Sequence, residues 1–542
     1  MNHTEQWIWL PEDIYKNEQT TVFSGFNKDK ADNYTVAEFK RTYTFSQKVV
    51  RAELRFSGDT AFQLFCNDGI IAAGPACIGG DFLGNETVRD NFYSFETTIY
   101  PDTTELDFFA RVQMFPYHIC EYSKGHGGFM LSALLIFEDG SKQAVFSDEN
   151  WLVRKNGAYN APKSYDGRIK PDNFVPAEIT PNIWNTITAP IPVREEAELC
   201  FENSTILLAP WEEKRVILEL DKIWAGFIKA EAETQGELHA EIICRELSEK
   251  TSPEQLIFSE NQSYRGFCMH SAGNIAVTAK NLTAQNAKLK VSFIKTHYPI
   301  YEEADTVTSD AELNEILRTC KHTLKICRQT HHLDSPRHCE PLACTGDYYI
   351  ESLMTPFSFD DMRLAEFDLL RTAVMLEREN GRMFHTTYSL IWAKMLYDVY
   401  MLNGNKTLLG QCEKALGLLL NRFETYLGEN GWHFNKKACE YAVKFLKDRS
   451  GNPIKPLSKE EVDQILQKNN IKLNKSVGWD YVYVANMAKS DMDSSPFSDE
   501  KAQATYVKIV IDDADSADGE IMACWYTKML FRHNPVDWGM FL

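Results

Sequence analysis

Apolar and polar residues alternate in short runs over about the first 300 residues of the chain. The runs RAELRF (51–56) and FQLF (62–65) have the period-two pattern that is typical of half-buried strands. Turn sequences such as Asn67-Asp68-Gly69 and Glu138-Asp139-Gly140 separate such runs. Strands at this spacing, without helical periods between them, predict β-sandwiches.

Two such β segments follow one another. We place a first β-sandwich domain at residues 1–180 and a second at 181–304, both jelly-roll-like in type. The second contains apolar alternation at 216–220 and 237–242. The stretch 155–195 is rich in Pro, Asn and Asp, and we expect it to be a connector.

The apolar period changes near residue 305. Ser309 lies three residues before Glu312, which is the spacing of a helix-capping box. Apolar residues then recur at helical spacing, at Leu313, Ile316, Leu317, Cys320, Leu324 and Cys327. Three further amphipathic segments, around Leu370, Met395 and Leu416, predict α-hairpins through residue 430.

The remaining segment, 431–542, does not continue this pattern. We interpret its apolar runs at 481–488 and 521–531 as helical, and predict a small helical domain of unknown role. Its acidic run at 512–515 lacks the glycine and the distal glutamate of a calcium-binding loop and is expected to be a solvated face.

Composition narrows the function classes. Lys and Arg number 57 against 77 Asp and Glu, a net charge of -20, which argues against a nucleic-acid partner. The N-terminus has no secretory signal pattern, and no apolar run approaches the ~18 residues of a membrane span. The 13 cysteines are scattered without a C-x-x-C pair, which favours reduced thiols and a cytoplasmic location.

One stretch, residues 331–351, concentrates groups that can carry chemistry. Its sequence HHLDSPRHCEPLACTGDYYIE holds carboxyl and imidazole groups among apolar residues, and Pro336 and Pro341 interrupt any continuous helix. Irregular backbone between helices is a frequent location of catalytic groups. Sugar hydrolysis needs two carboxyl groups, one that donates a proton and one that activates water or attacks carbon.

Two other interpretations of this stretch remain open on the residues alone. The acids could cap helices and pair with Arg337 or Arg363. A metal site at His331, His332, Asp334 and His338 is less favoured, because adjacent histidines rarely point at one ion and no H-x-x-x-H is present. We therefore expect no metal and no other cofactor.

The same stretch resembles the catalytic loop of the bacterial α-L-rhamnosidases of glycoside hydrolase family 78. That loop reads like D-C-P-x-R-x-E-x-L-G-W-T-G-D, and residues 334–347 read DSPRHCEPLACTGD. The resemblance extends through the N-terminal β-domain, the run Trp224–Phe227 and the helical residues 381–392, and covers about residues 1–430. It implies two β-sandwiches followed by an (α/α)6-barrel that is cut short near residue 430.

The resemblance also implies roles for individual residues. Glu340 corresponds to the general acid, and Asp334 and Asp347 correspond to carboxylates that hold sugar hydroxyls. The implied reaction is hydrolysis of terminal α-L-rhamnosides with inversion, so the expected partner is a carbohydrate, with no nucleic acid and no membrane. Candidate substrate-binding residues are Arg337, His338, Tyr348, Trp392 and Phe384.

Departures from the family pattern keep alternatives open. Cys344 stands where the family has an aromatic residue, and His338 stands where it has Arg. The general base is not identified, and Glu351, Glu424 and Glu429 are the nearest candidates. Impaired hydrolysis, carbohydrate binding without hydrolysis and a non-functional fusion are therefore the competing hypotheses. The sequence does not indicate an oligomeric state.

Overall fold

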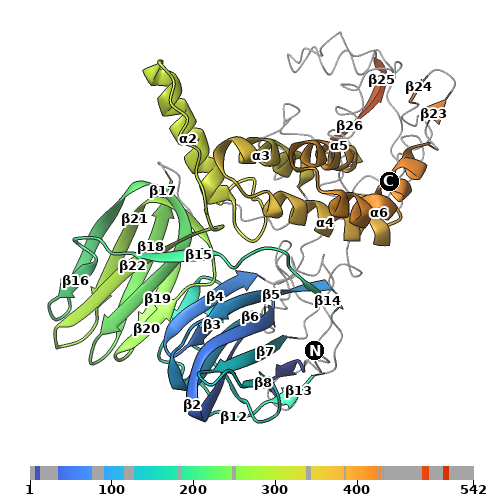
Figure 1. Ribbon diagram of the computed structural model, residues 1–542. Helices are drawn as coiled ribbons and strands as arrows, with labels where there is room; N and C mark the ends of the chain where they lie inside the picture. Colours follow the sequence, from blue (N-terminus) through green and yellow to red (C-terminus); the bar gives the residue numbers. More distant parts are fainter. Residues whose placement is uncertain are drawn as a thin grey trace. The chain divides into compact units, whose positions relative to one another are not determined.

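The computed structural model describes residues 6–11, 34–75, 91–114, 127–180, 185–246, 252–336, 344–383 and 386–424, and four strands at 427–428, 431–432, 479–486 and 505–511. Strands β1 to β22 precede the helices along the chain, and strands β23 to β26 follow them (Figure 1). The chain divides into two compact units. The first comprises residues 1–80, 84–371 and 397–405, and the second comprises 81–83, 372–396 and 406–542.

The first unit contains a twelve-stranded sheet that is organised around one long strand. Strand β2 pairs with β6 and β9 along its first half and with β5 and β7 along its second half, so a single strand serves two groups of neighbours. The strands are β1 (Ile8–Trp9), β2 (Thr35–Asp59), β3 (Ala61–Cys66), β4 (Gly69–Pro75), β5 (Asn91–Ile99), β6 (Thr103–Met114), β7 (Gly128–Phe137), β8 (Lys142–Phe146), β9 (Leu152–Lys155), β12 (Val175–Pro176), β13 (Glu178–Ile179) and β14 (Asn185–Thr188).

Turn chemistry in this sheet confirms the sequence prediction. Asn67 and Asp68 have φ values of 47° and 64°, the left-handed pair that a tight hairpin between β3 and β4 requires. Gly140 has φ 82° between β7 and β8. Asparagine, aspartate and glycine tolerate this region at low cost, which is why these turns could be recognised in the sequence.

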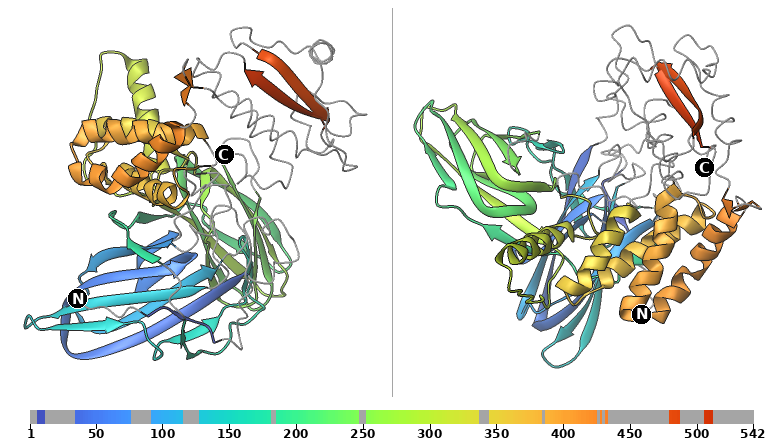
Figure 2. Two further views of the ribbon diagram at one scale, coloured as in Figure 1. Left: turned by 90° about the vertical axis from the view of Figure 1, so that its right-hand side faces the viewer. Right: turned by 90° about the horizontal axis from the view of Figure 1, so that it is seen from above.

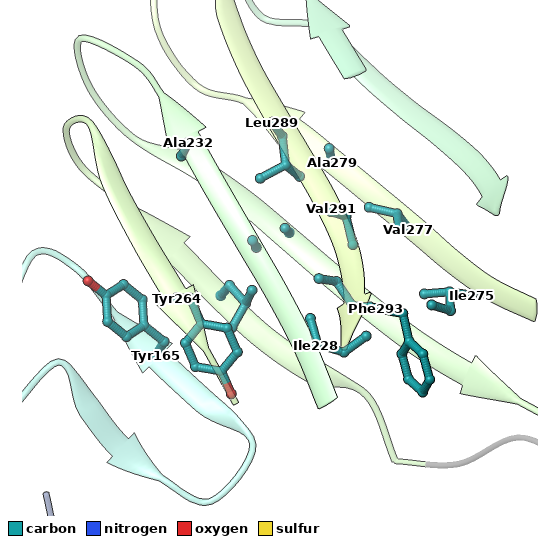
Figure 3. Close-up of a cluster of buried hydrophobic side chains, with 14 of the residues drawn as sticks. Tyr165, Ile228, Ala232, Tyr264, Ile275, Val277, Ala279, Leu289, Val291 and Phe293 are labelled. Carbon is teal, nitrogen blue, oxygen red and sulfur yellow. The ribbon is translucent and has the colours of Figure 1, made fainter. Parts of the chain in front are cut away.

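The first unit also contains a ten-stranded sheet. Side chains of its strands meet in one buried apolar cluster, in which Ile228, Val277, Leu289, Val291 and Phe293 converge (Figure 3). The strands are β10 (Tyr159–Ala161), β11 (Ser164–Asp166), β15 (Glu195–Leu199), β16 (Thr205–Leu208), β17 (Glu213–Glu233), β18 (Leu238–Arg245), β19 (Glu254–Phe258), β20 (Gln262–Arg265), β21 (His270–Asn281) and β22 (Ala287–His297). In Figure 2 its strands are green to yellow-green, and those of the twelve-stranded sheet are mostly blue to cyan.

Five helices follow the sheets: α2 (Ala311–Cys327), α3 (Thr345–Ser358), α4 (Arg363–Arg378), α5 (Thr386–Asn403) and α6 (Lys406–Glu424). The helical periods predicted after residue 305 are therefore confirmed as helices. The cap of α2 differs from the prediction. Asp310, not Ser309, is the N-cap, and its Oδ1 accepts hydrogen bonds from the backbone N–H groups of Glu312 and Leu313 at 2.9 and 3.1 Å.

Two further sequence predictions need correction. The stretch 155–195, expected to be a connector, contributes short strands to both sheets, β10 and β11 among them. The run 481–488, predicted helical, overlaps the strand β25 (Trp479–Asn486), which pairs with β26 (Thr505–Ile511). Its alternating tyrosines and valines favour a strand because β-branched and aromatic side chains pack well on a pleated surface. The run 521–531 lies outside the described residues.

The described residues are thus mostly β-sheet, in two large sheets, with five helices. No helix among them is both long enough and apolar enough to cross a bilayer.

Candidate functional site

The stretch singled out in the sequence leads from the end of α2 into α3. The structure describes it up to residue 336 and again from residue 344, which is the N-cap of α3. The interval between, residues 337–343, lies outside the described residues and contains Arg337, His338 and Glu340. Phe384 also lies outside the described residues. The site is therefore built from the groups that flank this interval.

The two aspartates of the motif lie on opposite sides of the interval. Asp334 precedes it and is exposed, and Asp347 follows it, half-buried, in the first turn of α3. Of the aromatic candidates, Tyr348 is 1% exposed and Trp392, which belongs to the second unit, is 0% exposed. Burial at this level favours a core role for both rings, because a ring that stacks on a sugar must offer one face to it.

The residues just before the interval are fixed by a buried ionic network. Nδ1 of His332 lies 2.6 Å from Oδ2 of Asp368 on α4, and Nε of Arg371 donates to Oδ1 of the same carboxylate at 2.9 Å. Burial acts to raise the pKa of Asp368, but the charge of Arg371 and the hydrogen bond from His332 hold it below its usual value. Burial lowers the pKa of His332 more than Asp368 raises it, so this imidazole is neutral near pH 7.

Tyr348 is the link between this network and α3. The guanidinium of Arg371 lies 4.9 Å from the Tyr348 ring centroid, a cation–π distance, and the ring of His332 lies 6.3 Å from it. Burial raises the pKa of Tyr348 well above its usual value, so its hydroxyl keeps its proton. The first turn of α3 is thereby tied to α4.

One turn further along α3, Glu351 holds a buried carboxyl group. Burial first, and then the charges of Asp368 and Asp347, raise its pKa well above the usual value, and Asp334 acts in the same direction. The thiol of Cys327 donates a hydrogen bond to this carboxyl and opposes that shift only in part. Oε2 of Glu351 has no hydrogen-bond partner. Burial and the surrounding charges thus favour the protonated form of Glu351, and one of its oxygens has no hydrogen-bond partner.

The raised pKa also bears on the search for a general base. Glu351 was among the candidates, and its raised pKa disfavours the carboxylate form that a base needs in order to take a proton from water. Its chemistry is that of a hydrogen-bond or proton donor. Glu424 ends α6, and Glu429 lies outside the described residues.

A third charged group, Arg328, lies at the end of α2 and is 0% exposed. Its guanidinium donates to the backbone oxygen of Asp361 at 2.8 Å and lies 4.7 Å from the Tyr298 ring centroid, while its Nε and Nη1 have no hydrogen-bond partner. Burial lowers the pKa of Arg328, and the charge of Asp361 opposes that shift. A buried cation thus lies at the end of α2, before the interval, and the buried carboxyl of Glu351 lies after it on α3.

In the part of the chain that the structure describes, no group of three or more His, Cys, Asp or Glu side chains could hold a metal ion. The two adjacent histidines serve different partners. Nδ1 of His331 lies 3.2 Å from the Thr330 hydroxyl, whereas His332 meets Asp368.

Asp368 and Arg371 were not predicted from the sequence. Their only signal is an acid and a base three residues apart on the apolar face of a helix, next to Phe367 and Leu369. That spacing is equally common on solvated helix faces. Their burial against His332 depends on tertiary packing.

Comparison with known proteins gives a family only for the C-terminal part. Residues 374–529 match a family described as a domain of unknown function, DUF7841. This match begins two residues after Thr372, where the second unit resumes. No curated protein matches the sequence.

Solved structures resemble the chain at the level of fold. An α-L-rhamnosidase from Dictyoglumus thermophilum is 14% identical, with a TM-score of 0.55 over 83% of this chain and 54% of that one. A GH78 family rhamnosidase of Bacillus sp. GL1 is 12% identical, with a TM-score of 0.59 over 80% of this chain and 71% of the other. An α-L-rhamnosidase from Streptomyces avermitilis, solved with L-rhamnose, is 11% identical, with a TM-score of 0.55 over 78% and 44%.

The chain spans about half the length of the Dictyoglumus enzyme that it matches. At these identities the likeness is one of fold, and the described part of the chain has a rhamnosidase-like fold.

Proposed function

We propose that the chain acts on terminal α-L-rhamnosides as a glycoside hydrolase, with Glu340 as the proton donor. The observation that carries this proposal is the convergence of acids at Glu351. Asp334, before the interval 337–343, and Asp347, after it, both raise the pKa of this one buried carboxyl. Carboxyl groups are thus gathered at both ends of the segment that contains Glu340.

The proposed chemistry follows from this arrangement. Inverting glycosidases protonate the leaving oxygen with one carboxylic acid and activate water with a second carboxylate on the other side of the sugar ring. Asp334 and Asp347 would accept hydrogen bonds from sugar hydroxyls, and Glu351 in its protonated form would donate a hydrogen bond to one. The proposed role requires that Glu340 hold its proton, which neighbouring acids would favour. Arg337, His338 and Phe384 remain proposed substrate contacts.

The decisive measurement is hydrolysis of an aryl α-L-rhamnoside by the whole chain. We expect Glu340→Gln to lower kcat by about 10²–10⁴-fold, the usual contribution of a general acid. Glu315→Gln, at an exposed position on α2, is the matched control and should leave kcat unchanged. Turnover that survives Glu340→Gln would refute the assigned role, and a folded wild-type chain that neither binds nor cleaves rhamnosides would refute the proposal.

A second candidate, carbohydrate binding without hydrolysis, is favoured by a groove on the ten-stranded sheet. This groove has a volume of about 700 Å³ and is lined by polar side chains beside Leu207, which is 64% exposed. The polar lining consists of Thr234, Gln235, Asn261 and Asn286 together with the charged Glu233, Glu260 and Lys288. Hydroxyl and amide groups beside an apolar surface are the chemistry that recognises a neutral sugar. Calorimetry separates the candidates, since binding of L-rhamnose with no product from the aryl rhamnoside would favour this second one.

A further inference from the structure

Helix α2 presents an apolar stripe to solvent. Leu313 and Ile316 are 43% and 51% exposed, Leu317 is half-buried and Cys320 is exposed. Their spacing, i, i+3, i+4 and i+7, places all four on one face of the helix. The sequence pattern alone predicts a buried stripe, yet the buried apolar residues of α2 are confined to its last turn, from Leu324 onward.

The two halves of α2 differ in how they are held. The C-terminal half is anchored on the ten-stranded sheet, because Nε2 of His322 lies 2.6 Å from the backbone oxygen of Ile223 and its ring meets that of Trp224 edge-on at 4.8 Å. The N-terminal half extends away from that sheet (Figures 1 and 2). A rigid, anchored helix with a projecting apolar end is a surface suited to docking.

Charge along α2 is segregated between the same two halves. Acidic residues come first along the helix and basic residues follow them: Asp310, Glu312 and Glu315, then Arg318, Lys321 and Lys325. Glu315 pairs with Arg318 within the helix, and Lys321 lies 3.7 Å from Glu303, but the opposite signs of the two ends remain. The helix dipole has its positive end beside the acids and its negative end beside the bases, so it reduces this segregation without reversing it.

We propose that α2 pairs antiparallel with α2 of a second copy of this chain, about a two-fold axis between Ile316 and Leu317. In this register Ile316 lies level with Leu317 of the second copy, and Leu313 lies level with Cys320. The whole stripe is therefore self-complementary, as a two-fold interface requires. Each acidic half lies alongside the basic half of the other copy.

Charge selects this occupant and this orientation. A parallel pair would place acid beside acid and base beside base, which is unfavourable. A partner helix of uniform charge would complement only one half of α2, whereas a second copy run in reverse complements both. About three turns of helix give an interface below the ~1,200 Å² of a stable complex, so the dimer is reversible and forms with rising concentration.

The first experiment measures the association of the whole chain by sedimentation at several protein concentrations. We expect a concentration-dependent dimer, and we expect Ile316→Glu to weaken it by at least about 10-fold, because the change places two like charges in the apolar contact near the axis. Leu207→Glu, at an exposed leucine on β16, is the matched control and should leave association unchanged. Equal melting temperatures of the three proteins show that folding is intact.

The second experiment tests the register by oxidation. Ile316→Cys places a thiol near the axis, so it should form a 316–316 disulfide that peptide mapping identifies. In the antiparallel register the two native Cys320 residues are offset by about seven residues, about 10 Å along the helix axis. They should therefore not form a disulfide with each other. A monomer at every concentration, a dimer that Ile316→Glu leaves unchanged, or a Cys320–Cys320 crosslink would each overturn the proposal.

Discussion

His332 and Asp368 are joined by a hydrogen bond of 2.6 Å between Nδ1 and Oδ2, with both side chains completely removed from solvent. Asp368 also accepts from the backbone N–H of His332 at 3.3 Å and from Nε of Arg371 at 2.9 Å. One carboxylate thus receives three donors, and it holds the chain onto α4 just before Asp334. This network fixes one end of the proposed site.

Removing the charge of Asp368 should therefore be costly. In Asp368→Asn the buried guanidinium of Arg371 loses its counter-charge, and breaking such a pair typically costs about 3–5 kcal/mol. We expect the free energy of unfolding, measured with urea at pH 7, to fall by this order. Glu315→Gln removes a pair whose partners are 64% and 72% exposed and should change it by no more than about 0.5 kcal/mol. A loss at Asp368 no larger than that of the control would contradict this account.

A second buried pair, His270 and Glu254, should make the fold less stable at alkaline pH. Nε2 of His270 lies 2.7 Å from Oε1 of Glu254. Burial opposes the imidazolium charge, but Cys244 and Glu254 outweigh it and raise the pKa of His270 to about 10. A raised folded-state pKa means that the stabilisation is fully present below about 6.5, the unfolded value, and declines as the pH rises toward 10.

The wild type should accordingly lose stability between pH 6.5 and 9.5, and this part of the decline should disappear in His270→Gln. Unfolding by urea at stepped pH values measures both. Glu254→Gln is the companion change, because it removes the negative partner and should flatten the same decline. Identical pH profiles for wild type and both variants would show that His270 is neutral in the fold.

The strands and helices could be predicted because each has a local signal. The alternation of 51–56 and the Asn67-Asp68-Gly69 turn depend on neighbouring residues alone, and both were found in β2 and at the β3–β4 hairpin. The run 481–488 was misassigned because a short apolar run does not distinguish strand from helix. The predicted domain boundary at 430 stays a prediction, although the second unit resumes at Thr372.

The candidate site could be predicted only in part, and for a physical reason. Asp334 and Asp347 were recognised from a motif, whereas the partners Asp368 and Arg371 lie on another helix and carry no motif. Glu351 was noted as a candidate base, and that burial and the charges around it raise its pKa could not be read from the sequence. Sequence reveals which groups are present, and packing determines which proton each one holds.

Two glycines offer stability predictions of opposite sign. A Cβ atom at Gly226 on β17 would lie 2.2 Å from the backbone oxygen of Ile294, so Gly226→Ala forces two paired strands apart and should cost about 1–3 kcal/mol. Gly417 lies inside α6 with nothing within 4 Å of such an atom, so Gly417→Ala should stabilise by about 0.5–1 kcal/mol. Thermal unfolding of the two variants beside wild type measures both signs, and a shift of the same sign in both would contradict the close approach at Gly226.

Glu351→Gln should make the chain more stable at pH 7 while damaging the proposed site. The folded-state pKa of Glu351 is raised well above its usual value, so folding binds a proton that the unfolded chain releases above about pH 4.5. This cost is absent at low pH, grows as the pH rises, and is removed by glutamine, which mimics the protonated acid in shape. The gain in free energy of unfolding should therefore be present at pH 7 and shrink toward pH 4.

If Glu351 donates a hydrogen bond to a sugar hydroxyl, the amide keeps part of that contact but supplies no acidic proton, so binding of L-rhamnose should survive better than hydrolysis. Glu351→Ala separates the two effects, because it leaves a cavity beside Cys327 and should lose stability as well as binding. A Glu351→Gln variant that is less stable than wild type at pH 7 would show that the carboxyl is ionised in the fold, and the acid cluster would then need a buried cation that neutralises it.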